Sequence, residues 1–148
     1  MLDAENRIKA AAYFLERARL EVNLGNESEL KWNIQASVVF AVSSIEVLPK
    51  DFSRMVGSGH SSRERKNTFR NWYAETVPLI GIYKQMNNER DLILHPGEPD
   101  KIVEHPHLRM YFPWDREHTA DSLCRSFIRS VESFLAKARI EFAELATN

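Results

Sequence analysis

Arg90 and His95 are the two residues whose types and spacing point most directly to chemistry. Arg90 falls on an apolar stripe of helical spacing, whose other members are Leu79, Tyr83, Met86 and Ile93 or Leu94. A guanidinium is rarely buried unless it is paired or meets a ligand. Pro96 disfavours helical dihedral angles at His95, so we expect the imidazole to leave the helix at its end. The two side chains could then converge on one small anion.

Nearby polar residues are the candidates for supporting this pair. Asn87 and Asp91 lie four residues apart, and Asn88 is adjacent to the first of them. Glu46, in the run Ser43-Ser44-Ile45-Glu46, ends another expected helix. The alternative is structural: the arginine pairs with Glu46 or Asp91, and the histidine interacts with the C-terminal dipole of its own helix.

The elements that must position these residues are helices. Apolar periodicity predicts helices over about 4–24, 63–76, 78–94 and 119–146, and a further helix from a cap at Asn26 or Ser28 to about Leu48. Pro49 is expected to end that helix. Pro78 is expected to lie in the first turn of the helix over 78–94. Segments 50–62 and 96–113 are predicted as loops, with 108–112 as a short strand or an extended arm. The fold class is therefore all-α, an antiparallel bundle of four to five helices with a long proline-rich loop before the last.

The segment Asn88-Glu89-Arg90-Asp91-Leu92-Ile93-Leu94-His95-Pro96 resembles the motif of the HEPN superfamily. In that motif an arginine, commonly with a polar neighbour such as Asp91, is followed shortly by a histidine. Family members are small all-α bundles with the motif at the end of a late helix. Many resemble metal-independent endoribonucleases of toxin or antiviral defence systems, and others are non-catalytic RNA-binding or scaffold proteins.

The resemblance implies a mechanism for Arg90 and His95. Histidine can take a proton from a ribose 2′-hydroxyl or give one to the departing 5′-oxygen, while arginine holds the scissile phosphate. One histidine cannot easily make both proton transfers in a single step. A homodimer that brings two such pairs into one cleft would supply both an acid and a base. The implied partners are RNA, a second copy of the chain and an antitoxin protein, and no metal or cofactor is needed.

A basic stretch is a second candidate for contact with RNA. Arg63, Arg65, Lys66 and Arg70 precede Trp72 and Tyr73 along one expected helix. The cations could guide RNA through phosphate contacts and the aromatic rings could stack on bases. The alternative is a solvated helix face with aromatic anchors in the core.

Two other classes of function remain open. The chain could be a non-enzymatic helical module for protein interaction or assembly, in which Arg90 stabilises a contact between subunits. It could also be a ligand-binding bundle that uses the same arginine to hold an anion without cleavage. His105, His107 and His118 match no standard zinc spacing, so no metal site is expected there.

Composition sets the outer limits. The chain has 148 residues, of which 43% are hydrophobic, and this suits one domain spanning residues 1–148. Twenty Lys and Arg against twenty-one Asp and Glu give a formal charge of -1, so any nucleic-acid contact must be a local patch. The single Cys124 favours a reducing compartment, and it lies where core packing is expected. No apolar run approaches a membrane span and the first residues do not resemble a signal peptide, so we expect a cytoplasmic protein.

Overall fold

A computed structural model describes residues 2–57, 59–95, 101–105 and 107–147. The predicted all-α class is confirmed. The elements are α1 (Asp3–Leu24), α2 (Glu27–Glu46), α3 (Leu48–Val56), α4 (His60–Thr76), the 3-10 helix η1 (Val77–Leu79), α5 (Tyr83–Leu94), β1 (Ile102–Glu104), β2 (Arg109–Tyr111) and α6 (Ala120–Thr147). None of the described helices is long and apolar enough to cross a membrane.

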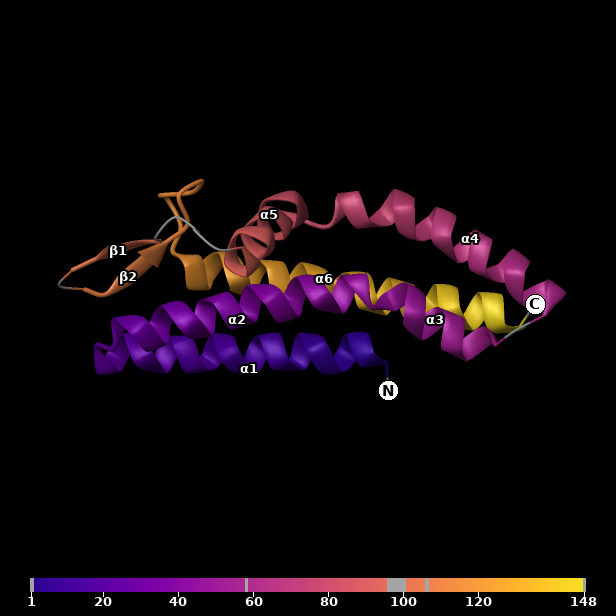
Figure 1. Cartoon of the computed structure of the whole chain (residues 1–148), viewed down its shortest axis with the longest axis horizontal. Coiled ribbons are helices and arrows are strands. Elements are labelled where there is room, and N and C mark those ends of the chain that lie inside the picture. Colours follow the sequence, from indigo (N-terminus) through magenta and orange to yellow (C-terminus); the bar gives the residue numbers. More distant parts are fainter. Residues whose placement is uncertain (1, 58, 96–100, 106, 148) are drawn as a thin grey trace.

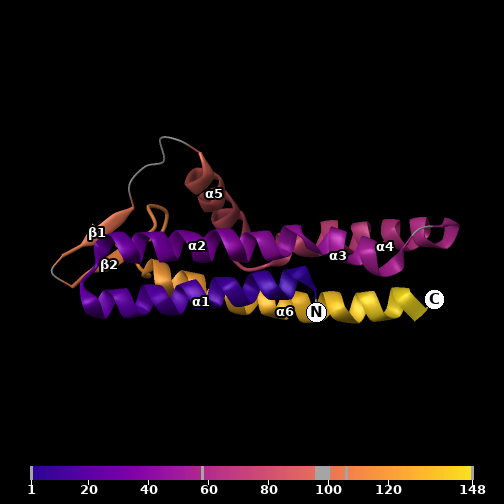
Figure 2. The ribbon, with the colours of Figure 1, turned by 60° about the horizontal axis from the view of Figure 1, so that its bottom comes forward.

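Helices α1 and α2 form an antiparallel hairpin, and they lie side by side in both views (Figures 1 and 2). Gly25 ends α1 in the left-handed conformation, with φ of 73°, which glycine adopts without steric cost. The Asn26 side chain then caps α2 by accepting a hydrogen bond of 3.1 Å from the backbone N–H of Glu29. The predicted end of the first helix near residue 24 and the predicted cap at Asn26 are confirmed.

Helix α6 packs along this hairpin and closes the core. The predicted apolar stripes are buried, and they include Ile8, Ala11, Leu15 and Ala18 of α1, Leu30, Ile34, Val38, Ala41 and Ile45 of α2, and Leu123, Phe127, Val131, Phe134, Ala138 and Phe142 of α6. Cys124 is buried beside them as expected, and burial raises the pKa of its thiol.

The prediction of a loop over residues 50–62 is wrong, because most of this segment is helical. Pro49 lies in the first turn of α3 rather than simply ending α2, since proline is tolerated in the first turn, where its missing N–H has no helical partner. Phe52 anchors α3 by stacking on Phe69 of α4, with ring centroids 4.4 Å apart. The Asp51 carboxylate accepts hydrogen bonds from the first backbone N–H groups of α1.

The predicted helix over 78–94 is shorter than expected. Pro78 lies in η1, and α5 begins only at Tyr83, after Ile82 adopts a left-handed backbone with φ of 54°. Leu79, assigned to the apolar stripe, is instead 81% exposed. The break turns α5 into a separate direction from α4, as Figure 1 shows.

The segment 96–113 is only partly a loop. Strands β1 and β2 pair antiparallel, with Val103 opposite Met110, so the strand expected within 108–112 is confirmed for Arg109–Tyr111. Met110, Tyr111 and Phe112 are buried and tie this β-arm to the helices. Residues 96–100 and 106 lie outside the described residues.

Candidate functional site

Arg90 lies on α5 and faces the end of α2. Its Nη1 donates to Glu46 Oε1, its Nε donates to Asp91 Oδ1 at 2.8 Å, and its Nη2 donates to Asn87 Oδ1 at 2.8 Å. The side chain is only 17% exposed. We call these four residues the Arg90 cluster. The expected supporting residues Glu46, Asn87 and Asp91 thus meet around the guanidinium, which has an acceptor for each of its nitrogens.

The contacts of the Arg90 cluster keep the guanidinium charged. Burial by itself would lower the pKa of Arg90, but the hydrogen bonds to Asp91 and Glu46 outweigh it and the pKa lies above its ordinary value. Burial, reinforced by the Glu46 carboxylate, raises the pKa of the neighbouring Tyr83. At neutral pH the arginine is therefore charged and the phenol is neutral.

The Arg90 cluster borders an open pocket of about 340 Å³ between α1, α2, α3 and α5. Its lining comprises Arg7, Val39, Ser43, Glu46, Val47, Lys50, Arg90 and Leu94. Arg7 donates to the Ser43 hydroxyl, and Lys50 forms no ion pair within the described part of the chain. Three cations and one carboxylate line this Arg90 pocket, so an anion is the ligand that it can best accept. Sequence reasoning missed Arg7 and Lys50, which come from distant parts of the chain.

His95 follows the helix directly. Its backbone is extended, with φ of -102° and ψ of 140°, as predicted from the proline after it. The side chain is exposed, and among the described residues it makes no hydrogen bond or ion pair. Its neighbour Leu94 lines the Arg90 pocket. Asn88 is exposed and does not join the cluster.

Helix α5 carries a second polar group, the buried carboxylate of Glu89, which was not predicted from the sequence. It is 2% exposed, its Oε2 lies 2.6 Å from Lys101 Nζ, and its Oε1 accepts a hydrogen bond of 2.9 Å from Trp114 Nε1. Trp114 stacks on Phe112, with ring centroids 5.3 Å apart. We call Glu89, Lys101 and Trp114 the Glu89 clamp, because it fastens the β-arm to α5. The spacing could have indicated this burial, because Glu89 follows Met86 by three residues and both lie on the buried face of α5.

The basic stretch lies on α4, and its aromatic neighbours point into the core. Trp72 stacks on Phe134 with ring centroids 5.5 Å apart, and the Tyr73 hydroxyl donates to the backbone oxygen of Ile45 at 2.9 Å. These rings fill the space between α4 and α6, so they are core anchors rather than a surface for stacking bases. Arg63, Lys66 and Arg70 line a hollow at the start of α4, and Arg65 is not among the residues that line it.

Two of the three loop histidines, His105 and His118, each meet one carboxylate. His105 Nε2 lies 3.0 Å from Glu27 Oε2, and His118 Nδ1 lies 3.1 Å from Asp115 Oδ2. Within the described ranges, no three His, Cys, Asp or Glu side chains gather in a way that could hold a metal ion.

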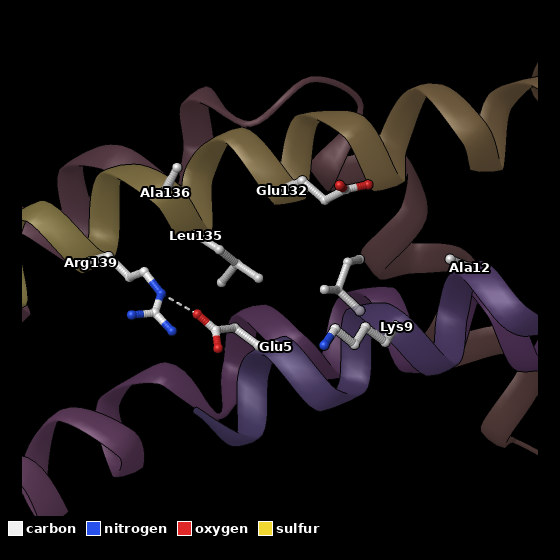
Figure 3. A pocket seen from close by; sticks show the side chains of 8 residues that line it. Glu5, Lys9, Ala12, Glu132, Leu135, Ala136 and Arg139 are labelled. Atoms are coloured by element: carbon white, nitrogen blue, oxygen red, sulfur yellow. Dashed lines mark hydrogen bonds and ion pairs between the residues drawn. The ribbon is translucent and has the colours of Figure 1, made fainter. Parts of the chain in front are cut away.

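A further groove, of about 450 Å³, lies between α1 and α6 (Figure 3). Its floor is apolar, from Ile8 and Leu135, and the ion pair between Glu5 and Arg139 closes one end. Figure 3 shows the two charged side chains reaching toward each other from the two helices. The hydrogen bond from Arg139 lowers the pKa of Glu5, although partial burial opposes this.

This ion pair makes stability depend on pH. Because the pKa of Glu5 is lower in the folded chain, its contribution is present above the ordinary pKa of glutamate and is lost as the pH falls through the folded value. Arg139→Ala is expected to raise the pKa of Glu5 and to cost at most about 1 kcal/mol at neutral pH, since Arg139 is largely exposed. A carboxyl NMR titration together with urea unfolding at two pH values measures both effects. An unchanged pKa of Glu5 in the variant would contradict the assignment.

Comparison with known proteins adds no relative: no protein-family model, no curated protein and no solved structure matches the chain.

Proposed function

We propose that this protein is a HEPN-like RNA-cleaving bundle that works without metal, with Arg90 and His95 as the active pair. The observation that supports it most is the placement of Arg90. Its guanidinium borders an open cationic pocket near the end of α5, and the exposed His95 follows directly. This combination suits a phosphodiester, whose charge the pocket offsets while the imidazole exchanges protons.

The proposed roles follow from the contacts. Arg90 binds the scissile phosphate, while Glu46, Asn87 and Asp91 hold the guanidinium in place. A neutral imidazole accepts the proton of the ribose 2′-hydroxyl, and the freed oxygen attacks phosphorus. The bond to the 5′-oxygen breaks, and a protonated imidazole gives that oxygen its proton. The products are a 2′,3′-cyclic phosphate and a 5′-hydroxyl.

Two histidines are needed for these simultaneous transfers, so we propose a homodimer in which each copy supplies one His95. The elements that border the Arg90 pocket carry large exposed apolar residues. Tyr13 on α1, Trp32 on α2 and Leu94 on α5 are each at least 60% exposed. Of these residues Leu94 lines the Arg90 pocket, and an exposed apolar side chain beside a pocket favours a protein contact.

A second candidate is a non-catalytic module that binds RNA or a protein such as an antitoxin. The observation in its favour is that every nitrogen of the Arg90 guanidinium already has an acceptor within the chain. In this case the arginine joins α5 to α2, and the pocket holds an anion without cleaving it.

Incubation of the purified protein with labelled single-stranded RNA and a chelator tests the proposal. We expect chelator-resistant cleavage whose products carry 2′,3′-cyclic phosphate and 5′-hydroxyl ends. His95→Ala protein, purified in parallel, controls for a contaminating nuclease. Products with 3′-hydroxyl ends, or RNA binding without any scission, would reject the enzyme and leave the non-catalytic candidate.

A further inference from the structure

We infer that the hollow at the start of α4 binds the phosphate backbone of RNA and does not read its bases. The inference rests on the proposed function for the choice of RNA as ligand. The hollow measures about 560 Å³ and is separate from the Arg90 pocket. Its lining is Gly59, Ser62, Arg63, Lys66, Asn67 and Arg70.

The cations of this hollow share one face of α4. Arg63, Lys66 and Arg70 follow each other at spacings of three and four residues, which places them in a row about 10 Å long. A row of positive charge along a helix matches successive phosphates of a strand better than a single small anion.

These charges are also available for a ligand. Within the described part of the chain, none of the three forms an ion pair, and no acidic residue lines the hollow. Several cations elsewhere on the surface are paired, as Arg54 is with Asp3 at 2.8 Å, whereas in this hollow three cations that form no ion pair with a described residue lie on one face of a helix. In a chain of formal charge -1, unpaired cations in one hollow are the local basic patch that nucleic-acid contact requires.

The N-terminus of α4 adds to the attraction of the hollow for phosphate groups. Gly59 is the N-cap residue, it offers no side chain to the first turn, and that turn contains no acidic residue. The backbone N–H groups and the positive end of the helix dipole therefore lack a negative partner from the cap.

The lining explains why bases are not read. Stacking requires an exposed aromatic ring, and none lines the hollow. The nearest aromatic residues in sequence, Phe69, Trp72 and Tyr73, are stacked or hydrogen-bonded within the core. Phosphate contacts fix position without carrying sequence information, so binding here is independent of sequence.

The position of the hollow bears on RNA length. The hollow lies at the start of α4, and this end of the helix is farther from α5 than the other end is (Figure 1). Helix α4 has 17 residues and is about 25 Å long. An RNA that contacts both the hollow and Arg90 on α5 must therefore be longer than one that contacts the hollow alone.

Binding measured by fluorescence anisotropy tests this inference. The probes are labelled oligo-U and a mixed-sequence single-stranded RNA of equal length, and all proteins carry His95→Ala to prevent cleavage. The test variant is Arg63→Gln/Lys66→Gln/Arg70→Gln. The control, Lys84→Gln/Arg129→Gln/Lys137→Gln, removes the same charge from exposed positions on α5 and α6.

Affinity for RNA falls as salt rises, and each phosphate contact to a single strand contributes about 0.7 to the steepness of log affinity against log salt. Because the test variant removes three cations, we expect its dependence on salt to be less steep by about 2. Both RNAs should lose affinity equally, and the control should stay within about twofold of the parent. Equal losses in test and control variants, or a preference of the parent for one RNA, would overturn the inference. Binding that depends on α4 without cleavage by the wild-type chain would reject the enzyme but retain this site.

Discussion

Replacing Glu89 with alanine is expected to lower the free energy of unfolding by about 3–5 kcal/mol, the range for breaking a buried ion pair. The change removes the carboxylate that lies 2.6 Å from the Lys101 ammonium and the acceptor of the Trp114 N–H. Both charged side chains are 2% exposed, so water does not replace the lost contacts cheaply. Urea unfolding followed by circular dichroism and tryptophan fluorescence measures the loss.

A matched variant separates this effect from the general cost of losing a helical glutamate. Glu75→Ala on α4 changes an exposed glutamate and is expected to stay within about 0.5 kcal/mol of the wild type. Glu89→Leu combined with Lys101→Met removes both charges, and it should recover much of the stability because apolar residues of similar volume avoid the desolvation cost. Equal losses for Glu75→Ala and Glu89→Ala would show that the Glu89 clamp does not contribute.

The clamp has a consequence for the candidate site because Glu89 and Arg90 are adjacent on α5. One fastens the helix to the β-arm, and the other faces α2. Helix α5 has few fully buried side chains, Met86 and Glu89 among them. Loosening the clamp should therefore shift α5 and disturb the Arg90 cluster, even though no clamp residue lines the pocket.

Sequence patterns predicted the features of the fold that depend on the spacing of residues close together in the chain. The stripes of α1, α2 and α6 fix which faces are buried, and the Gly25-Asn26 stop follows from backbone preferences. Pro49 was predicted only to end a helix, and its place in the first turn of the next helix was not predicted. The buried contacts of Phe52 and Asp51, which stabilise α3, come from residues far apart in the sequence and leave no periodic signal.

The same distinction holds for the candidate site. Arg90, Asn87 and Asp91 share one helix, so their meeting follows from helical geometry, and the polar end of α2 made Glu46 a reasonable partner. Lys101 and Trp114 could not be paired with Glu89 from sequence, because helical periodicity places a residue on a face but does not say which distant segment covers that face. Arg7 and Lys50 were missed for the same reason.

Within the proposed function, His95→Ala is expected to lower the rate of RNA cleavage by about 10²–10⁴-fold, the usual contribution of a general acid or base. The exposed imidazole makes no described contact, so the free energy of unfolding should change by less than about 0.5 kcal/mol. Single-turnover cleavage of labelled RNA measures the rate, and urea unfolding measures the stability. The contrast between a large kinetic effect and a small stability effect is what distinguishes a catalytic residue from a structural one.

Arg90→Lys sharpens this contrast, because lysine keeps the positive charge but cannot serve three acceptors with a planar fork. It should lower both cleavage and stability, since Glu46, Asn87 and Asp91 all depend on the guanidinium. His95→Ala protein that cleaves RNA at the wild-type rate, beside Arg90→Lys protein that is only less stable, would contradict the active pair. Arg90 would then be explained by its contact between α2 and α5, and the Arg90 pocket would be a site for holding an anion.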